Sequence, residues 1–343
     1  MIVMLHSNWK SLLTTSSKEL DGSETNTFLA RNGMVFVLVS LQRLGSIVGF
    51  TLLLVLGTFL VQTVAAHRGL DKTIKLLSQS VKQRPNDVDL RLRRALVYRK
   101  HGEPRRALRD LQWALHLQPG RHEVSLSLAQ TYLELKRYKQ AAWTIHQYLM
   151  CHRPHWMAFV IQAKVLQHHG QWKRAIRSYS LAIAIAPHID FFVARGRIQE
   201  EQKQWAKATK GYREGLRLLG SPGVLQVGLL RSLMGSRKHR EALAWVNHVL
   251  KGLAVKGDWW LHRARVYDAL KRKTLAKLDR LRTLKEADEL LAIRRNGWVL
   301  LRRARANWAL GRFQKALRDW KTVLTLFPQL KSQVPMQLES KKE

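Results

Sequence analysis

Small and apolar residues recur along most of the chain at a nearly fixed interval. An alanine returns after 34, 34, 33, 34, 34 and 40 residues, at Ala107, Ala141, Ala175, Ala208, Ala242, Ala276 and Ala316. A second series keeps the same steps twelve residues earlier, at Ala95, Ala129, Ala163, Gly196, Leu230, Ala264 and Ala304. Within each interval the apolar residues follow helical spacing in two runs, which predicts two helices per unit.

Two phrases at opposite ends of this series are nearly the same. Residues 107–120 read ALRDLQWALHLQPG, and residues 316–329 read ALRDWKTVLTLFPQ. The triplet RRA and a glycine precede both phrases at the same offsets, at residues 93–95 with Gly102 and at 302–304 with Gly311. This register indicates that the phrases are the first and last copies of one repeated unit.

Each unit is predicted to be a helical hairpin. An aliphatic residue stands three positions before every member of the second series, at Leu92, Leu126, Val160, Val193, Val227, Leu261 and Leu301. Prolines that block continuation of the second helix close several units, at Pro119, Pro154, Pro187, Pro222 and Pro328. One hairpin cannot bury its apolar face alone, so neighbouring hairpins must stack to complete a core.

The order of residues within a unit resembles the tetratricopeptide repeat family. The first unit carries the pattern at Ala95, Tyr98, Gly102, Ala107, Leu111, Ala114 and Pro119, and the third carries most of it from Ala163 to Pro187. The resemblance covers about residues 70–328. It implies an all-α, right-handed superhelical solenoid of about seven helix–turn–helix repeats over residues 67–328, preceded by one hydrophobic helix.

Four segments depart from this pattern. The fifth unit has Leu230 in the small-residue position and no closing proline, and the sixth carries about six additional residues around KEADELLAIRR. The insertion puts the regularity of the superhelix in question between residues 277 and 297. Residues 73–85 are predicted to form an unpaired second helix, and residues 329–343 a polar C-terminal tail that frays.

Residues 47–66 form a run of 20 residues without a charge, IVGFTLLLVLGTFLVQTVAA. A helix of this length spans roughly 30 Å of hydrocarbon, so we predict a transmembrane anchor or a signal sequence. Small residues at Val64 and Ala66 fit a signal peptidase site, and cleavage near Ala66 would release a periplasmic or secreted domain. Residues 1–46 are a polar N-terminal segment, in which Met34 is an alternative start.

Basic residues around this run favour an uncleaved anchor. The 20 residues before Ile47 contain two Lys or Arg, and the 20 residues after Ala66 contain five. Because positive charge stays on the cytoplasmic side, this difference favours a single-pass membrane protein with its solenoid in the cytoplasm.

Net charge distinguishes the predicted solenoid from the N-terminal region. The chain has 60 Lys and Arg against 24 Asp and Glu, a net charge of +36, of which residues 1–66 contribute only +1. Such an excess attracts anionic surfaces, which include nucleic acid, anionic lipid, an acidic polymer and an acidic protein segment.

The family resemblance also implies where a partner binds. In this family the first helices of successive hairpins line a concave groove that holds a peptide or a helix of a partner protein. The residue after each small position is implied to face this groove, and here these residues are Leu96, Gln130, Lys164, Arg197, Arg231, Arg265 and Arg305. The last five are cations, which suggests a basic groove that pairs with an acidic partner segment. The alternative is that an arginine-rich composition fills exposed positions without a ligand.

Other functions remain as alternatives to a membrane-tethered scaffold. A basic groove with aromatic residues is also typical of nucleic-acid binding, and an exported solenoid would suit an adaptor for an anionic envelope polymer. The aromatic residues that precede the recurrent alanines by three positions are expected to pack between hairpins instead of stacking on bases; these are Tyr138, Trp172, Trp205 and Phe313.

Catalytic and metal chemistry find little support in the sequence. Cys151, His152 and His155 are close in sequence but lie on a predicted turn at Pro154 without a second ligand pair, so a metal site is not expected. The chain has no phosphate-binding glycine loop and no GxSxG motif. We therefore expect no enzyme activity and no cofactor.

Overall fold

The computed structural model describes residues 69–335 of a chain that divides into two compact units, Met1–Pro85 and Asn86–Glu343. In the first unit, residues 69–83 form a helix, as the pattern at 73–85 predicts. The predictions for the polar segment 1–46 and the hydrophobic run 47–66 concern residues outside the described part. Among the described residues, no helix combines the length and apolar character needed to cross a bilayer.

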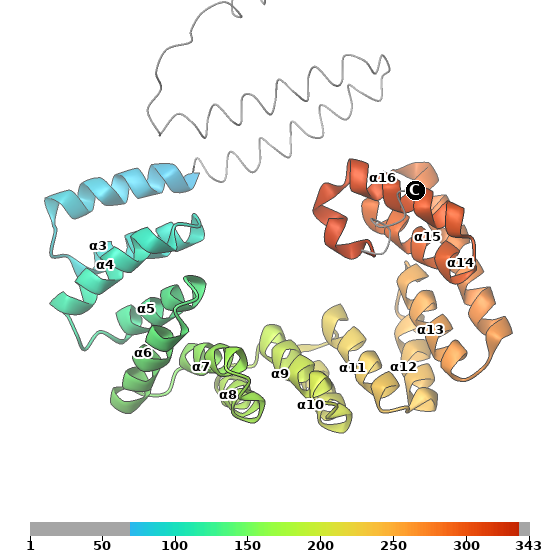
Figure 1. Cartoon of the computed structure of the whole chain (residues 1–343), viewed down its shortest axis with the longest axis horizontal. Helices are drawn as coiled ribbons and strands as arrows, with labels where there is room; N and C mark the ends of the chain where they lie inside the picture. Colours follow the sequence, from blue (N-terminus) through green and yellow to red (C-terminus); the bar gives the residue numbers. More distant parts are fainter. Residues whose placement is uncertain (1–68, 336–343) are drawn as a thin grey trace, which may run out of the picture. The chain divides into compact units, whose positions relative to one another are not determined.

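In the described part of the second unit, residues 86–335, all regular elements are helices, and the α-helices follow one another in seven antiparallel pairs (Figure 1). The first helices of the pairs are α3 (Val88–Lys100), α5 (His122–Glu134), α7 (Trp156–His168), α9 (Ile189–Glu201), α11 (Gly223–Gly235), α13 (Gly257–Ala269) and α15 (Gly297–Ala309). The second helices are α4 (Pro104–Leu117), α6 (Tyr138–Cys151), α8 (Trp172–Ile185), α10 (Trp205–Leu219), α12 (His239–Lys251), α14 (Lys273–Ile293) and α16 (Phe313–Leu326). The predicted all-α array of about seven hairpins is confirmed over these residues.

The recurrent small residues lie where the two helices of a pair meet. Every alanine of the two series is at most 1% exposed. Gly196 faces Tyr212 so closely that a Cβ atom on Gly196 would lie 2.4 Å from Cζ of the tyrosine ring. Leu230, the large residue of the series, is also buried in the same core. Close approach of paired helices therefore explains the two series.

Each helix pair turns at a residue with positive φ, seven positions after the small residue. Glycine occupies this position in three pairs, at Gly102, Gly170 and Gly311. The other four pairs place a cation there, at Lys136, Lys203, Arg237 and Lys271, with φ between 54° and 60°. A residue with a Cβ atom pays roughly 1–2 kcal/mol for this left-handed conformation, so four of the seven turns carry local strain.

The insertion in the sixth unit lengthens a helix and leaves the order of the pairs intact. Helix α14 has 21 residues, whereas the second helices of the other pairs have 13 to 15. Glu286 stands ten residues after Ala276, where most other second helices end, and the added turns follow it. Its carboxylate lies at the start of α13 and accepts hydrogen bonds from the backbone N–H groups of Lys256 and Gly257, both at 2.7 Å. It also pairs with Arg302 of α15 at 3.0 Å. Glu286 thus caps α13 and joins two successive pairs.

The end of the described chain packs on the last helix pair. Residues Pro328–Gln333 form the 3-10 helix η2, and Leu330 and Val334 are buried in a core cluster with Leu301 and Trp320. Up to residue 335 the chain is therefore ordered against α15 and α16, in contrast to the fraying predicted from residue 329. The reason is the apolar spacing of Leu330 and Val334, which the polar composition of the tail concealed.

Candidate functional site

The first helices form the inner row of the second unit. Helix α3 packs against α5, α5 against α7, α9 against α11, and α13 against α15. Among the described residues, no two successive second helices contact each other to a comparable extent. The row of first helices is therefore more closely spaced than the row of second helices. We call the exposed side chains of the first helices the inner face.

The five predicted groove cations occupy one equivalent position on five successive first helices. They lie on α7, α9, α11, α13 and α15 as Lys164, Arg197, Arg231, Arg265 and Arg305, and Leu96 and Gln130 hold the same position on α3 and α5. The first four cations are exposed and Arg305 is half-buried. Their surroundings differ, which divides them into two groups.

Arg231 and Arg305 have partners within the chain. The guanidinium of Arg231 donates a hydrogen bond of 2.6 Å to the carboxylate of Glu200, which is itself buried and accepts a second bond from Ser232. Arg305 donates to the backbone carbonyl of Gln333 at 3.4 Å. Burial, followed by the neighbouring charge of Arg265, lowers the pKa of Arg305, while Asp258 opposes that change.

Lys164, Arg197 and Arg265 form no ion pair or hydrogen bond with a described side chain. Arg265 lies close to the half-buried imidazole of His262. Burial is the main cause that lowers the pKa of His262 to about 4, and Arg265 and Arg305 add to this effect against the opposing charge of Asp258. His262 is therefore neutral at physiological pH, and the positive charge at this end of the inner face comes from the arginines.

A hollow of about 560 Å³ lies on the inner face beside Lys164. Gln130 and Lys164 line it together with Trp172 and Glu201. Tyr138 also lines it, and its ring stacks on His168 with 3.5 Å between ring centroids and 12° between ring planes. Among the described residues, this is the place where the predicted groove position combines a free cation with aromatic surface.

The aromatic residues before the recurrent alanines pack on the next helix pair, as predicted from their spacing. Tyr138 of α6 meets His168 of α7. A Cβ atom added to Gly235 of α11 would lie only 2.4 Å from the ring of Trp205 of α10, so these two residues are in close contact. Phe313 differs, because it is half exposed and contacts Trp308 of its own pair edge-on.

A set of ion pairs inside the hairpins has no counterpart in the sequence predictions. The arginine before the small residue of the first helix binds an aspartate 16 residues later on the second helix, through two hydrogen bonds of 2.6–2.9 Å. These pairs are Arg94–Asp110, Arg263–Asp279 and Arg303–Asp319. The first and last pairs come from the repeated RRA and ALRD phrases, which were the available signal. In the third hairpin Gln162 and Ser178 make a neutral hydrogen bond of 2.8 Å at the same spacing.

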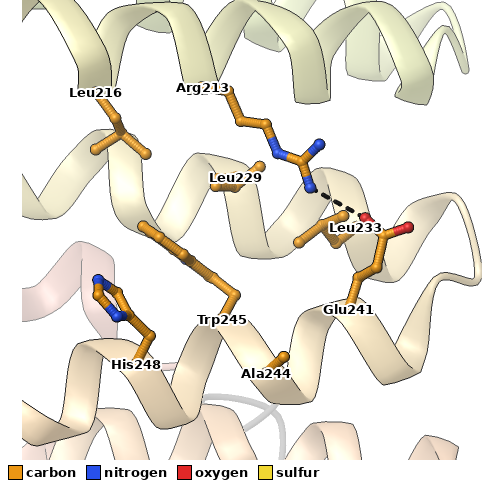
Figure 2. A pocket seen from close by; sticks show the side chains of 8 residues that line it. All are labelled: Arg213, Leu216, Leu229, Leu233, Glu241, Ala244, Trp245 and His248. Atoms are coloured by element: carbon orange, nitrogen blue, oxygen red, sulfur yellow. Dashed lines mark hydrogen bonds and ion pairs between the residues drawn. The ribbon is translucent and has the colours of Figure 1, made fainter.

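The second and fifth hairpins carry leucine where the others carry Arg or Gln, and an open apolar furrow lies over each leucine. Leu128 lines a furrow of about 400 Å³ between α4 and α6, with Trp143 among its lining residues. Leu229 lines the equivalent furrow of about 460 Å³ between α10 and α12. Figure 2 shows Trp245 lying across this second furrow and the ion pair between Arg213 and Glu241 bridging it, with 3.0 Å between N and O. These furrows open on the side of the second helices, away from the predicted groove cations.

The two histidines that follow Cys151, His152 and His155, contact neighbouring groups of the chain. The Nδ1 atom of His155 accepts a hydrogen bond from the backbone N–H of Met157 and thereby caps α7. The ring of His152 lies 5.1 Å from that of Tyr148, between centroids. Within residues 69–335, no group of three or more His, Cys, Asp and Glu side chains is placed to hold a metal ion.

Comparison with known proteins agrees with this geometry. Residues 74–145 match the family model described as tetratricopeptide repeat. The solved structure of the C-terminal part of a TPR repeat-containing protein from Cytophaga hutchinsonii aligns with 71% of this chain and 100% of its own length, at a TM-score of 0.53 and 19% identity. The described chain has the tetratricopeptide-repeat fold.

Other comparisons add little to this fold. A tetratricopeptide repeat protein from Parabacteroides merdae aligns with 73% of this chain and 98% of its own length, at 13% identity and a TM-score of 0.49. A search of curated protein sequences gave no significant match. The tetratricopeptide-repeat fold is a protein-interaction scaffold in type, since stacked helix pairs leave long exposed faces for a partner.

Proposed function

We propose that this chain is a non-catalytic scaffold whose inner face binds an acidic segment of a partner protein. The observation that carries the proposal is that Lys164, Arg197 and Arg265 are exposed at one repeated position and have no carboxylate partner among the described residues. Each can pair with a ligand carboxylate without first breaking an internal contact, and arginine does so at two points.

The mixed charge of the inner face favours a peptide over a nucleic acid. Glu201 lines the same hollow as Lys164, and Asp258 is close enough to Arg305 to affect its pKa. A continuous phosphate backbone would be repelled where it runs beside these carboxylates. A peptide can instead place acidic residues opposite the arginines and other residues elsewhere. Nucleic-acid binding is therefore the second candidate.

The binding experiment uses the full chain in detergent with a fluorescent 12-residue glutamate-rich peptide as the probe, at 0.15 M salt. The test variant is Arg197→Glu with Arg265→Glu. The control is Arg294→Glu with Arg295→Glu, which changes the net charge equally at exposed residues between α14 and α15. We expect the test variant to raise the Kd roughly 10-fold or more and the control to change it much less.

Two results would contradict the proposal. Equal loss of affinity in both variants would mean that net charge, and no defined face, attracts the peptide. Tighter binding of a 12-nucleotide single-stranded RNA, with the steep salt dependence of phosphate contacts, would support nucleic-acid binding instead.

We also propose that residues 47–66 tether the scaffold to a membrane as an uncleaved anchor, with the solenoid in the cytoplasm. The proposal rests on the length of the uncharged run and on the basic residues that follow it. Mass spectrometry of the mature N-terminus distinguishes the anchor from cleavage near Ala66. Protease accessibility of the solenoid in sealed membrane vesicles of known orientation then distinguishes the cytoplasmic from the opposite side.

A further inference from the structure

The second helices α4, α6 and α8 present an unbalanced positive charge on the side away from the inner face. Helices α6 and α8 contain no Asp or Glu, and the single carboxylate of α4, Asp110, is buried and bound to Arg94. Exposed cations of these three helices without a partner among the described residues include Arg105, Arg109, Lys139, Lys173 and Arg177. Nothing within the helices themselves neutralises this surface.

The same three helices expose large apolar side chains between these cations. Trp143 and Met150 of α6 are 65% and 73% exposed, although both residue types are usually buried. Trp113 of α4 and Leu181 and Ile185 of α8 are also exposed. We call the exposed side chains of α4, α6 and α8 the outer face.

We infer that the outer face binds the surface of an anionic lipid bilayer. Interfacial protein surfaces combine Trp and aliphatic side chains, which enter the boundary between headgroups and acyl chains, with Lys and Arg that pair with anionic headgroups. Each basic residue near such a surface contributes about 1 kcal/mol to binding. The outer face supplies both kinds of residue on three neighbouring second helices.

The exposed aliphatic side chains of the outer face favour lipid over nucleic acid as the anionic partner. Met150, Leu181 and Ile185 protrude as single side chains, which a deformable lipid surface can accommodate. A nucleic acid would use the cations but would leave these aliphatic side chains exposed to water, because base stacking needs aromatic rings.

The furrow between α4 and α6 continues this apolar surface inward. Trp143 stands at the furrow, and Leu115, Leu128 and Tyr132 line it. The equivalent furrow between α10 and α12 has Ala244 in place of Trp143, and the pair of Arg213 with Glu241 crosses it. Its tryptophan, Trp245, is only partly exposed and donates a hydrogen bond of 3.2 Å to the backbone carbonyl of Gln226. The two furrows therefore differ in the features that lipid binding needs, which restricts the inference to the first half of the array.

Cys151 provides a direct probe of this contact. It is the single cysteine of the chain, is exposed, and stands on α6 eight residues after Trp143, so both lie on one side of the helix. The experiment attaches an environment-sensitive fluorophore to Cys151 and reconstitutes the full chain into vesicles of phosphatidylcholine alone or with phosphatidylglycerol. Any hydrophobic anchoring is then common to both lipids, and the fluorophore reports only on the outer face.

We expect a blue-shifted emission and quenching by brominated acyl chains in the anionic vesicles, and neither effect in the neutral ones. The variant Lys173→Glu with Arg177→Glu should reduce the membrane-contacting fraction roughly 10- to 30-fold, because two favourable charges are lost. The same two charge reversals at Arg294 and Arg295 should leave the emission unchanged.

Three outcomes would overturn the inference. The first is equal emission in neutral and anionic vesicles, and the second is an unchanged signal in the variant with reversed charges on α8. The third is a response to soluble single-stranded RNA without any quenching by brominated lipid. None of them bears on peptide binding by the inner face, which is measured in detergent with a different probe.

Discussion

Arg94 and Asp110 bind each other through two hydrogen bonds of 2.6 and 2.7 Å across the first helix pair, and Arg303 and Asp319 repeat this contact 209 residues later. The RRA triplets and the phrases that follow them, at both ends of the array, thus contain the two halves of an ion pair. The ion pair joins the two helices beside the buried alanines. The same contact in the sixth pair, between Arg263 and Asp279, can be tested directly.

Substitution of Asp279 by Ala is expected to destabilise the sixth helix pair by about 3 kcal/mol. Asp279 is 1% exposed, and its loss leaves the guanidinium of Arg263 largely buried without its carboxylate. The measurement is unfolding in guanidinium chloride, monitored by circular dichroism.

The chain itself suggests the control for this variant. The second hairpin has Leu128 and Thr144 at the equivalent positions, so Arg263→Leu with Asp279→Thr copies an arrangement that already folds. We expect the double variant to recover most of the lost stability. Equal loss in the single and double variants would show that the pair is not the cause.

Substitution of Lys203 by Gly is expected to stabilise the chain by about 1 kcal/mol. Lys203 has a φ of 54°, where a residue with a Cβ atom is strained and glycine is not. Conversely, Gly170→Ala should cost about the same amount, since φ is 67° and a Cβ atom there meets no neighbour. Gly120→Ala is the control, because Gly120 has equal space without a positive φ. The measurement is the shift of the denaturation midpoint of each variant relative to the unchanged chain. Destabilisation by Lys203→Gly would contradict the argument that the positive φ is strained.

Substitution of Glu286 by Ala is expected to loosen the start of α13. The backbone N–H groups of Lys256 and Gly257 lose their acceptor and Arg302 loses one of two carboxylates, at a cost of about 2 kcal/mol. Amide hydrogen exchange at the N-terminus of α13 should accelerate. Glu289→Ala, which removes an exposed carboxylate from the same helix, should leave that exchange unchanged.

Acidification is expected to destabilise the array through His262. Its pKa is about 4 in the folded protein, below the ordinary value of 6.5, so the unfolded chain binds more protons between these two values. The stabilising contribution is complete above pH 6.5 and is lost as pH falls towards 4, with a total on the order of 3 kcal/mol. His262→Gln should reduce the difference between unfolding free energies at pH 7 and pH 4.5. An unchanged difference would mean that this imidazole accepts protons freely in the folded state.

Much of the fold follows from the sequence because recurrent small residues mark the places where the two helices of a pair meet. The series from Ala95 and from Ala107 predicted all seven helix pairs in order, since small side chains at these positions let paired helices approach closely; Leu230 is the exception in the fifth pair. Gly102 signalled a turn, but Lys203 did not, because the positive φ there is imposed by the hairpin on a residue that does not favour it.

The candidate site was less accessible to sequence reasoning. The repeat places Arg197 and Arg231 at the same position, yet only Arg231 has an internal carboxylate partner, which comes from Glu200 on the preceding first helix. The periodic pattern describes one unit, whereas this difference arises between units. The outer face was also missed, because Trp113 and Leu181 follow the recurrent alanine by six residues but Trp143 follows it by two, so the three form no single series.

The contact between Arg231 and Glu200 has a further consequence for selectivity. A ligand carboxylate that approaches Arg231 meets a guanidinium whose charge is already offset by Glu200, which accepts a hydrogen bond of 2.6 Å from Nε, and whose Nη2 donates to the hydroxyl of Tyr212. A second carboxylate is therefore attracted less strongly to Arg231 on α11 than to Arg197 or Arg265, which have no neighbouring carboxylate partner among the described residues. A ligand whose acidic groups match α9 and α13 but skip α11 would be preferred over a uniformly acidic one.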